Sequence, residues 1–148
     1  MTEEKLRLLE KQLRQMHKAA AGLSWSLQRC QPLDSQQLSA EDEEKFETLT
    51  ARFARMSDIL IQKIFRRVDD LDLESPGTVR DRINRAEKKE LIDSARDFVV
   101  IRELRNAIAH EYEDEALSNI HAEVLRLTPV LLAVPEKINQ YLQEKLKR

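Results

Sequence analysis

The sequence contains very little glycine, proline or cysteine. Two glycines and four prolines stand among 148 residues, so few positions interrupt a helix, whereas charged residues make up 35% of the chain. A mixture rich in Leu, Glu, Lys, Arg and Ala favours long helices. The single cysteine, Cys30, excludes an internal disulfide framework and a multi-cysteine zinc site. The length suits one domain, residues 1–148, with a core of its own.

Strong net charge and long apolar runs are also absent. The net charge is −2, so no overall positive field predicts a nucleic-acid-binding protein. The first residues lack the apolar stretch of a secretory signal. The longest apolar runs, 98–101 and 130–134, are far shorter than a membrane-spanning helix. We therefore expect a cytoplasmic protein that does not engage a membrane.

Two long apolar stripes dominate the first half of the chain. Over residues 3–30, apolar residues recur at alternating spacings of three and four, which predicts a helix with one packed face. A second helix is expected from about 41 to 70, after Ser39 and an acidic first turn. The residues expected to face inward on that helix are Phe46, Leu49, Phe53, Met56, Leu60, Ile64 and Val68.

Caps and breaks divide the second half. After a break at 75–77, Thr78 with Asp81 predicts the start of a short helix through about Leu91, and Ser94 with Asp97 predicts another from Ala95 to about His110. In the last segment, 117–141, we expect a kink or a restart, with Thr128 as cap and Pro129 as first helical residue. The sequence thus predicts an all-α, up-and-down bundle of four to five helices.

The candidate functional residues lie in one octapeptide, Arg105-Asn-Ala-Ile-Ala-His-Glu-Tyr112. Arg102, Asn106 and His110 are spaced by four and share a helix face. Arg105 is five residues from His110, roughly 140° around an ideal helix, so it does not sit beside that histidine. A second copy related by a two-fold axis could supply the missing partner. The spacing therefore suggests a composite site in a homodimer.

From the spacing alone, the octapeptide is more simply interpreted as an ordinary solvent-exposed helix face. Arginine, asparagine and histidine often occupy solvated helix faces, and the helix dipole favours a histidine near a C-terminus. We expect His17 and His121 on the surface and Trp25 in the core or at an interface.

The pattern Arg-Asn-x-x-x-His, within Arg-x-x-x-x-His-x-Tyr, resembles the signature of HEPN domains, and specifically of the HepT-like branch. The layout around it is similar as well: a capped short helix, then residues 101–104, the motif, an acidic turn, and a final helix with a proline at 127–129. The resemblance covers roughly residues 75–145.

This resemblance implies a metal-independent ribonuclease toxin that acts as a homodimer on tRNA or mRNA, without metal or cofactor. Carried over, Arg105 would hold the scissile phosphate, and Asn106 would orient the histidine or the phosphate. His110 would be the general base or acid at the ribose 2′-hydroxyl or the leaving 5′-oxygen. The walls of a local basic cleft for RNA would be Arg80, Arg82, Arg85, Arg102 and Arg105.

The resemblance also implies a small nucleotidyltransferase antitoxin, which would transfer AMP to Tyr112 and so block the site. An alternative is a non-catalytic subunit that holds a nucleotide, or presents Tyr112, for a partner nucleotidyltransferase. A third possibility is a purely structural helical dimer in which the motif is ordinary surface.

Overall fold

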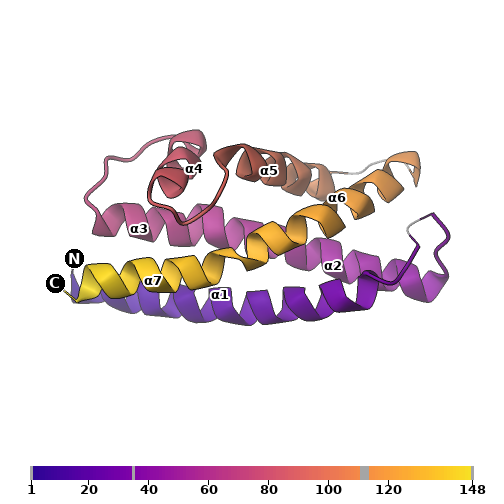
Figure 1. The fold of residues 1–148 in the computed structure, drawn as a ribbon, viewed down its shortest axis with the longest axis horizontal. Helices are drawn as coiled ribbons and strands as arrows, with labels where there is room; N and C mark the ends of the chain where they lie inside the picture. The colour runs from indigo at the N-terminus through magenta and orange to yellow at the C-terminus, as the bar shows by residue number, and fades with distance from the viewer. Residues whose placement is uncertain (1, 35, 111–113, 148) are drawn as a thin grey trace.

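The computed structural model describes residues 2–34, 36–110 and 114–147, the first three of the last range by backbone alone. Throughout this part of the chain the regular structure is helical, and successive segments run up and down one bundle (Figure 1). The order is α1 (Glu3–Cys30), α2 (Ala40–Asp58), the π-helical η1 (Ile59–Ile64), α3 (Phe65–Leu71), α4 (Val79–Lys88), α5 (Ala95–Ala109), α6 (Asp114–Leu132) and α7 (Val134–Leu146). The two termini lie together at one end (Figure 1). The all-α bundle is confirmed.

The apolar stripe of α1 is buried as its spacing predicts. Leu9, Met16, Leu23, Leu27 and Cys30 are all in the core, packed mainly against the antiparallel α2. Burial raises the pKa of the Cys30 thiol, which favours its neutral form. The first helix therefore contributes one continuous wall of the core.

The segment from α2 to α3 is one continuous helical path through the middle of the bundle. All seven residues that the sequence predicted to face inward on it are buried, and three of the four phenylalanines lie on it. The fourth, Phe98 of α5, packs against Phe65 with ring centroids 5.8 Å apart. This path contacts α1, α4, α5 and α6, and so organises the fold.

The π-helical turn η1, which the sequence analysis did not predict, interrupts this path. Met56, Leu60, Ile64 and Val68 are spaced by four, so on a regular α-helix each would be rotated roughly 40° from the last. The wider π turn compensates for this drift and keeps all four side chains in the core. The guanidinium of Arg82 donates to the Ile61 carbonyl oxygen in this turn, at 3.1 Å.

The predicted caps are present, but α4 ends earlier than expected. Thr78 and Ser94 accept hydrogen bonds from the backbone N–H of Asp81 and Asp97. The last helical residue of α4 is Lys88, because Glu90 has φ 63° and the backbone N–H of Leu91 bonds back to the Ala86 carbonyl. This is the left-handed C-terminal cap that usually contains glycine.

The prediction that Pro129 starts a new helix is wrong. Pro129 lies inside α6, and the Thr128 hydroxyl donates to the Val124 carbonyl at 2.6 Å instead of capping a following helix. The break comes at Ala133, and Pro135 stands in the first turn of α7. A proline in the first turn costs no hydrogen bond, which explains why the restart uses Pro135.

By length and composition alone, Leu117–Leu146 is apolar enough to cross a membrane, contrary to the expectation from single apolar runs. Core helices of soluble proteins also pass this test of length and composition, so the result alone does not show that the stretch crosses a membrane. In this structure the stretch contributes fully buried Val124, Leu127, Leu131 and Ile138 to the bundle core.

The left-handed caps generate a stability prediction. Leu73 follows α3 with φ 59° and its side chain is 90% exposed, so it has backbone strain without packing in return. Leu73→Gly should raise the free energy of unfolding by about 0.5 to 1 kcal/mol, since glycine adopts this conformation freely. Urea denaturation measures it. Ala51→Gly, at an exposed interior position of α2, is the control and should lower stability by about 1 kcal/mol. Equal effects of the two substitutions would contradict the prediction.

Candidate functional site

The candidate residues are carried by the second half of α5. Ile101 and Leu104 anchor this helix in the core, and Arg102 and Asn106 are exposed on another face. Two of the three residues predicted to form a polar stripe therefore share a solvent-facing surface, whereas His110 follows the last residue of α5. Core packing and the Ser94 cap fix the rotation of the helix and hence the direction of this stripe.

Arg105 points away from that stripe, toward α2. Its Nε donates to Asp58 Oδ1 at 2.8 Å and its Nη2 to Asp58 Oδ2 at 2.9 Å, a planar two-bond pairing. Hydrogen bonds and charge from Asp58 raise the pKa of Arg105. Both side chains are about one-third or more exposed, so the pair contributes little to stability but fixes the guanidinium. No local signal in the sequence identified Asp58, since it lies 47 residues from Arg105.

Asn106 and Arg102 line a small groove together with Arg80 of α4. The groove has a volume of about 270 Å³, and Ile83, Val99 and Glu103 complete its wall. Within the described ranges, neither Arg80 nor Arg102 has a carboxylate within 4.0 Å. The groove therefore presents two guanidinium groups, one amide and the single carboxylate of Glu103, and the first three are donors suited to phosphate oxygens.

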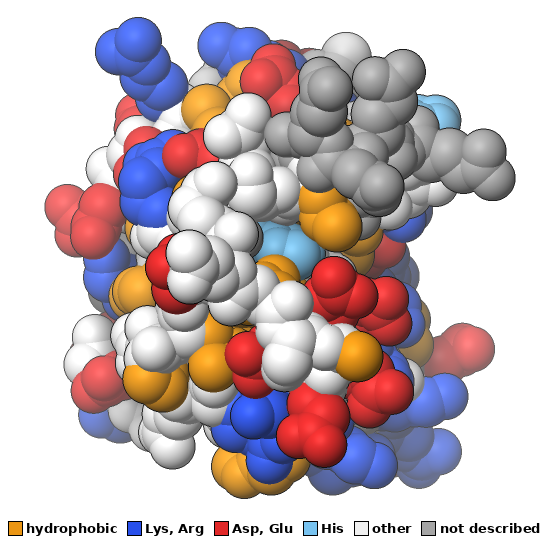
Figure 2. Space-filling model, turned by 90° about the vertical axis from the view of Figure 1, so that its right-hand side faces the viewer, with side chains coloured by type: hydrophobic (Ala, Val, Ile, Leu, Met, Phe, Trp, Pro, Cys, Tyr) orange, Lys and Arg blue, Asp and Glu red, His pale blue; other side chains and the backbone are white. Residues whose placement is uncertain are grey.

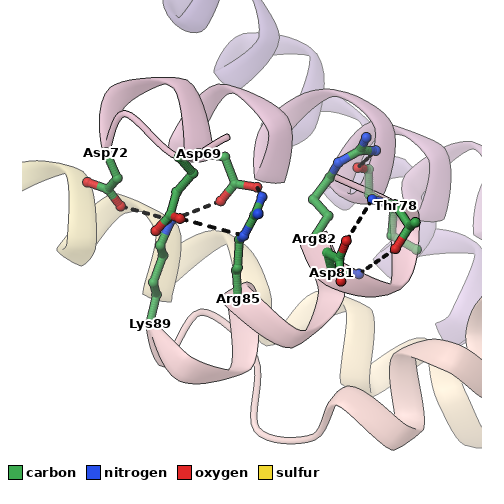
Figure 3. A network of polar contacts seen from close by, with 9 residues as sticks. Asp69, Asp72, Thr78, Asp81, Arg82, Arg85 and Lys89 are labelled. Atoms are coloured by element: carbon green, nitrogen blue, oxygen red, sulfur yellow. Dashed lines mark hydrogen bonds and ion pairs between the residues drawn. The ribbon is translucent and has the colours of Figure 1, made fainter. Parts of the chain in front are cut away.

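Arg82 and Arg85, also predicted to bind RNA, are engaged inside the molecule (Figure 3). Arg82 donates to Ile61 and Gln62 of η1. Arg85 pairs with Asp69 at 3.3 Å and with Glu74 at 3.6 Å. Burial lowers the pKa of Arg82, and nearby Arg66 and Arg102 lower it further. These contacts hold α4 against η1 and α3, and so place the wall of the groove.

A neighbouring ion-pair network fixes the end of α3 (Figure 3). Lys89 lies 2.8 Å from Asp69 and 3.0 Å from Asp72, and the Tyr141 hydroxyl of α7 also donates to Asp72. Burial alone would raise the pKa of Asp72, but hydrogen bonds from Tyr141, Lys89 and Lys145 leave it below its ordinary value. The network ties α3, α4 and α7 together, and a 620 Å³ hollow beside it is lined by charges of both signs.

His110 directly follows α5 and has an extended backbone, φ −99° and ψ 153°. Its backbone N–H bonds to the Ala107 carbonyl at 3.2 Å, and its side chain is exposed. Tyr112 lies outside the described residues. The structure thus groups Asn106 with Arg80 and Arg102, and fixes Arg105 on the α2 side.

The surface placement expected for His121 is wrong. Its side chain is 3% exposed and stacks on Phe46, with ring centroids 4.3 Å apart. Burial lowers its pKa, so it is held as a neutral, aromatic core residue. Trp25, which was expected in the core or at an interface, is outside the core of this chain, since its side chain is 52% exposed. His17 is exposed, as expected.

Across residues 2–34, 36–110 and 117–147, whose side chains the structure describes, no group of three or more His, Cys, Asp or Glu side chains is arranged to hold a metal ion. Comparisons of the chain with protein-family models, with curated proteins and with solved structures found no match.

The burial of His121 predicts a pH-dependent stability. Its pKa is lower in the folded protein than the ordinary 6.5, so the unfolded chain binds a proton first as the pH falls. The stabilisation is complete above pH 6.5 and is lost below it, by up to about 1.4 kcal/mol per pH unit. His121→Phe keeps the stack on Phe46 and should reduce the loss in unfolding free energy between pH 7.5 and 5.5.

Denaturant unfolding at the two pH values measures the effect. His17→Gln, on the exposed face of α1, is the control and should behave as the wild type does. An unchanged pH dependence in His121→Phe would show that other groups cause the loss.

Proposed function

We propose that this chain is a HepT-like, metal-independent RNA endonuclease toxin whose site is completed by a second copy of the chain. The observation that carries the proposal is the groove in which Asn106 joins Arg80 and Arg102, one helical turn before the exposed His110. Two arginines without carboxylate partners beside an amide suit phosphate oxygens, and the exposed imidazole four residues after Asn106 suits proton transfer. The resemblance of residues 105–112 to the HepT-like signature supports the same reaction.

In this proposal each side chain has a separate role. Arg80 and Arg102 bind phosphates that flank the cut. His110 accepts the proton of the ribose 2′-hydroxyl or donates one to the leaving 5′-oxygen, as the 2′-oxygen attacks phosphorus and the bond to the 5′-oxygen breaks. Asn106 orients the phosphate by hydrogen bonds, and Arg105 stabilises the developing negative charge.

The geometry of Arg105 is compatible with that role. A guanidinium has five N–H donors, and Asp58 uses one on Nε and one on Nη2. Both donors on Nη1 and one on Nη2 can still reach a phosphate oxygen. Because Asp58 directs Arg105 toward α2, the arginine serves a different surface from the groove of its own chain. A second chain that brings its own α5 alongside would supply the arginine that the groove lacks.

The proposed partner is a small nucleotidyltransferase that transfers AMP to Tyr112, two residues after His110. The alternative is a non-catalytic subunit of such an enzyme. The pairing of Arg105 with Asp58 favours that alternative, since the charge required in the transition state is already balanced by a carboxylate. The two functions differ in whether the chain itself cuts RNA.

The purified protein should cleave single-stranded RNA in excess chelator, because no step uses a metal ion. Arg105→Ala and His110→Ala should each lower the cleavage rate at least about 100-fold, the order expected for loss of charge stabilisation or of an acid–base group. Gel analysis of a labelled oligoribonucleotide gives the rate.

Two matched variants serve as controls. Arg126→Ala removes an equivalent two-bond pairing, with Glu123, on α6, and His17→Ala removes an exposed histidine from α1. Both should cut RNA at the wild-type rate. If the wild type leaves RNA intact yet binds a nucleotidyltransferase tightly, the non-catalytic alternative is correct.

A composite site predicts complementation between inactive variants. A dimer of Arg105→Ala with His110→Ala has one site that draws both intact groups from opposite chains. After an equal mixture has exchanged subunits, half of the dimers are mixed and each has one of two sites intact, so about one quarter of the wild-type rate should return. A site contained in one chain would give no recovery in this assay.

A further inference from the structure

One face of α1 displays basic side chains and a tryptophan to solvent. Lys11, Arg14, Lys18, Trp25 and Arg29 are all exposed. On an α-helix their positions fall within roughly 60° of one another, opposite the buried stripe. We call these five residues the α1 basic face. It is separate from the groove between α4 and α5.

The α1 basic face is unusual because no acidic residue interrupts it. Residues 11–30 contain four basic side chains and no Asp or Glu. Within the described part of the chain, none of these four has a carboxylate within 4.0 Å, whereas Arg7 near the start of the helix pairs with Glu3. Ordinary solvated faces mix both signs. Figure 2 views the bundle from the end at which α1 finishes, and there Lys and Arg side chains lie along the lower side together with Asp and Glu side chains.

Trp25 provides a second, independent indication of a ligand. Its indole is 52% exposed, with the Arg29 guanidinium 4.6 Å and the Arg52 guanidinium 5.6 Å from the ring centroid. Arg52 is held in place, since it donates to the Gly22 carbonyl at 2.9 Å and to the Ser26 hydroxyl at 2.8 Å. The hollow around these groups has a volume of about 530 Å³. A large aromatic ring is thus kept at the surface beside two guanidinium groups, one of which, Arg52, is held in place by hydrogen bonds.

We propose that the α1 basic face binds single-stranded RNA, with phosphates on Lys11, Arg14 and Lys18 and an unpaired base stacked at Trp25. Aromatic stacking combined with basic side chains along a track is how proteins hold single strands without reading their sequence. The proposal rests on the proposed function for the identity of the polyanion, and it gives the substrate a second contact remote from His110.

The dimensions and the charge distribution support a strand that runs along α1. From Lys11 to Arg29 the helix rises about 27 Å, with cations at Lys11, Arg14 and Lys18 about 4.5–6 Å apart. Glu41 and Glu44 also line the hollow at Trp25, which repels phosphate there and favours a base. A membrane surface is a poorer occupant, because the apolar side of α1 is already buried in the bundle and little remains to insert.

Trp25 is the single tryptophan of the chain, so intrinsic fluorescence reports this site directly. We would titrate the full-length His110→Ala protein, which is not expected to cut, with a single-stranded oligoribonucleotide. Stacking should quench the emission in a saturable manner. Anisotropy of a labelled RNA gives the affinity for variants that lack the indole, and Trp25→Ala should bind about tenfold more weakly.

The charge contribution is tested with Lys11→Gln/Arg14→Gln/Lys18→Gln. Each phosphate contact contributes about 0.7 to the slope of log affinity against log salt, so this variant should lower the slope by about 2. The control, Lys88→Gln/Arg96→Gln/Lys147→Gln, removes the same charge from exposed positions elsewhere and should retain the wild-type slope.

The proposal is overturned if both triple variants bind RNA equally, or if saturating RNA leaves Trp25 emission unchanged. It is also overturned if the α1 basic face is needed for anionic phosphatidylserine vesicles and not for RNA. These results are distinct from a failure of the proposed function. RNA bound through α1 by a wild-type protein that does not cut it would leave this inference standing and exclude the nuclease.

Discussion

The structure depends on the burial of one helical path, from Phe46 to Val68, on several sides at once. The path packs against α1, α4, α5 and α6, which fixes its position, and the π-helical η1 is the local adjustment that keeps its four-residue spacing in register. Two functional placements follow from this adjustment. Asp58, immediately before η1, holds Arg105, and Arg82 reaches the Ile61 carbonyl from α4 and thereby positions the groove.

The arginines in and around the motif differ in what they can do because of their partners. Arg82, Arg85 and Arg105 are bound to carbonyl or carboxylate oxygens of the chain, whereas Arg80 and Arg102 line a groove with Glu103 but have no described carboxylate within 4.0 Å. These contacts fix the direction of the bound guanidinium groups, and the paired carboxylates neutralise part of their positive charge. The local electrostatic potential around α5 is therefore determined by the contacts that its arginines and those of α4 make with α2, η1 and α3. The number of basic residues between positions 80 and 110 does not determine it.

Short-range patterns predicted much of the fold. The stripes of α1 and of residues 41–70, the caps at Thr78 and Ser94, and the inward face of α5 follow from periodicity and cap chemistry, which are local. The buried His121 and the Asp58–Arg105 pair depend on residues far away in the sequence, so no window along the chain reveals them. The π turn has a local signal, the spacing of four from Met56 to Val68, but an α-helical template does not detect it. The prediction for Pro129 is wrong for a related reason. Proline favours the first turn of a helix, but the core contacts of Val124, Leu127 and Leu131 keep α6 helical on both sides of Pro129. In the candidate site, the shared surface of Arg102 and Asn106 was predictable, whereas the partners of each arginine were not.

The placement of both termini at one end of the bundle has a practical consequence for how the chain can be joined to other domains (Figure 1). The C-terminal end of α5, which carries Arg105 and Asn106, lies in the other half of the molecule. A domain or affinity tag fused to either end would project away from that end of α5 and leave its surface open. A fusion at both ends at once would instead place the two added domains next to each other, and the rigid bundle between them would keep them close together.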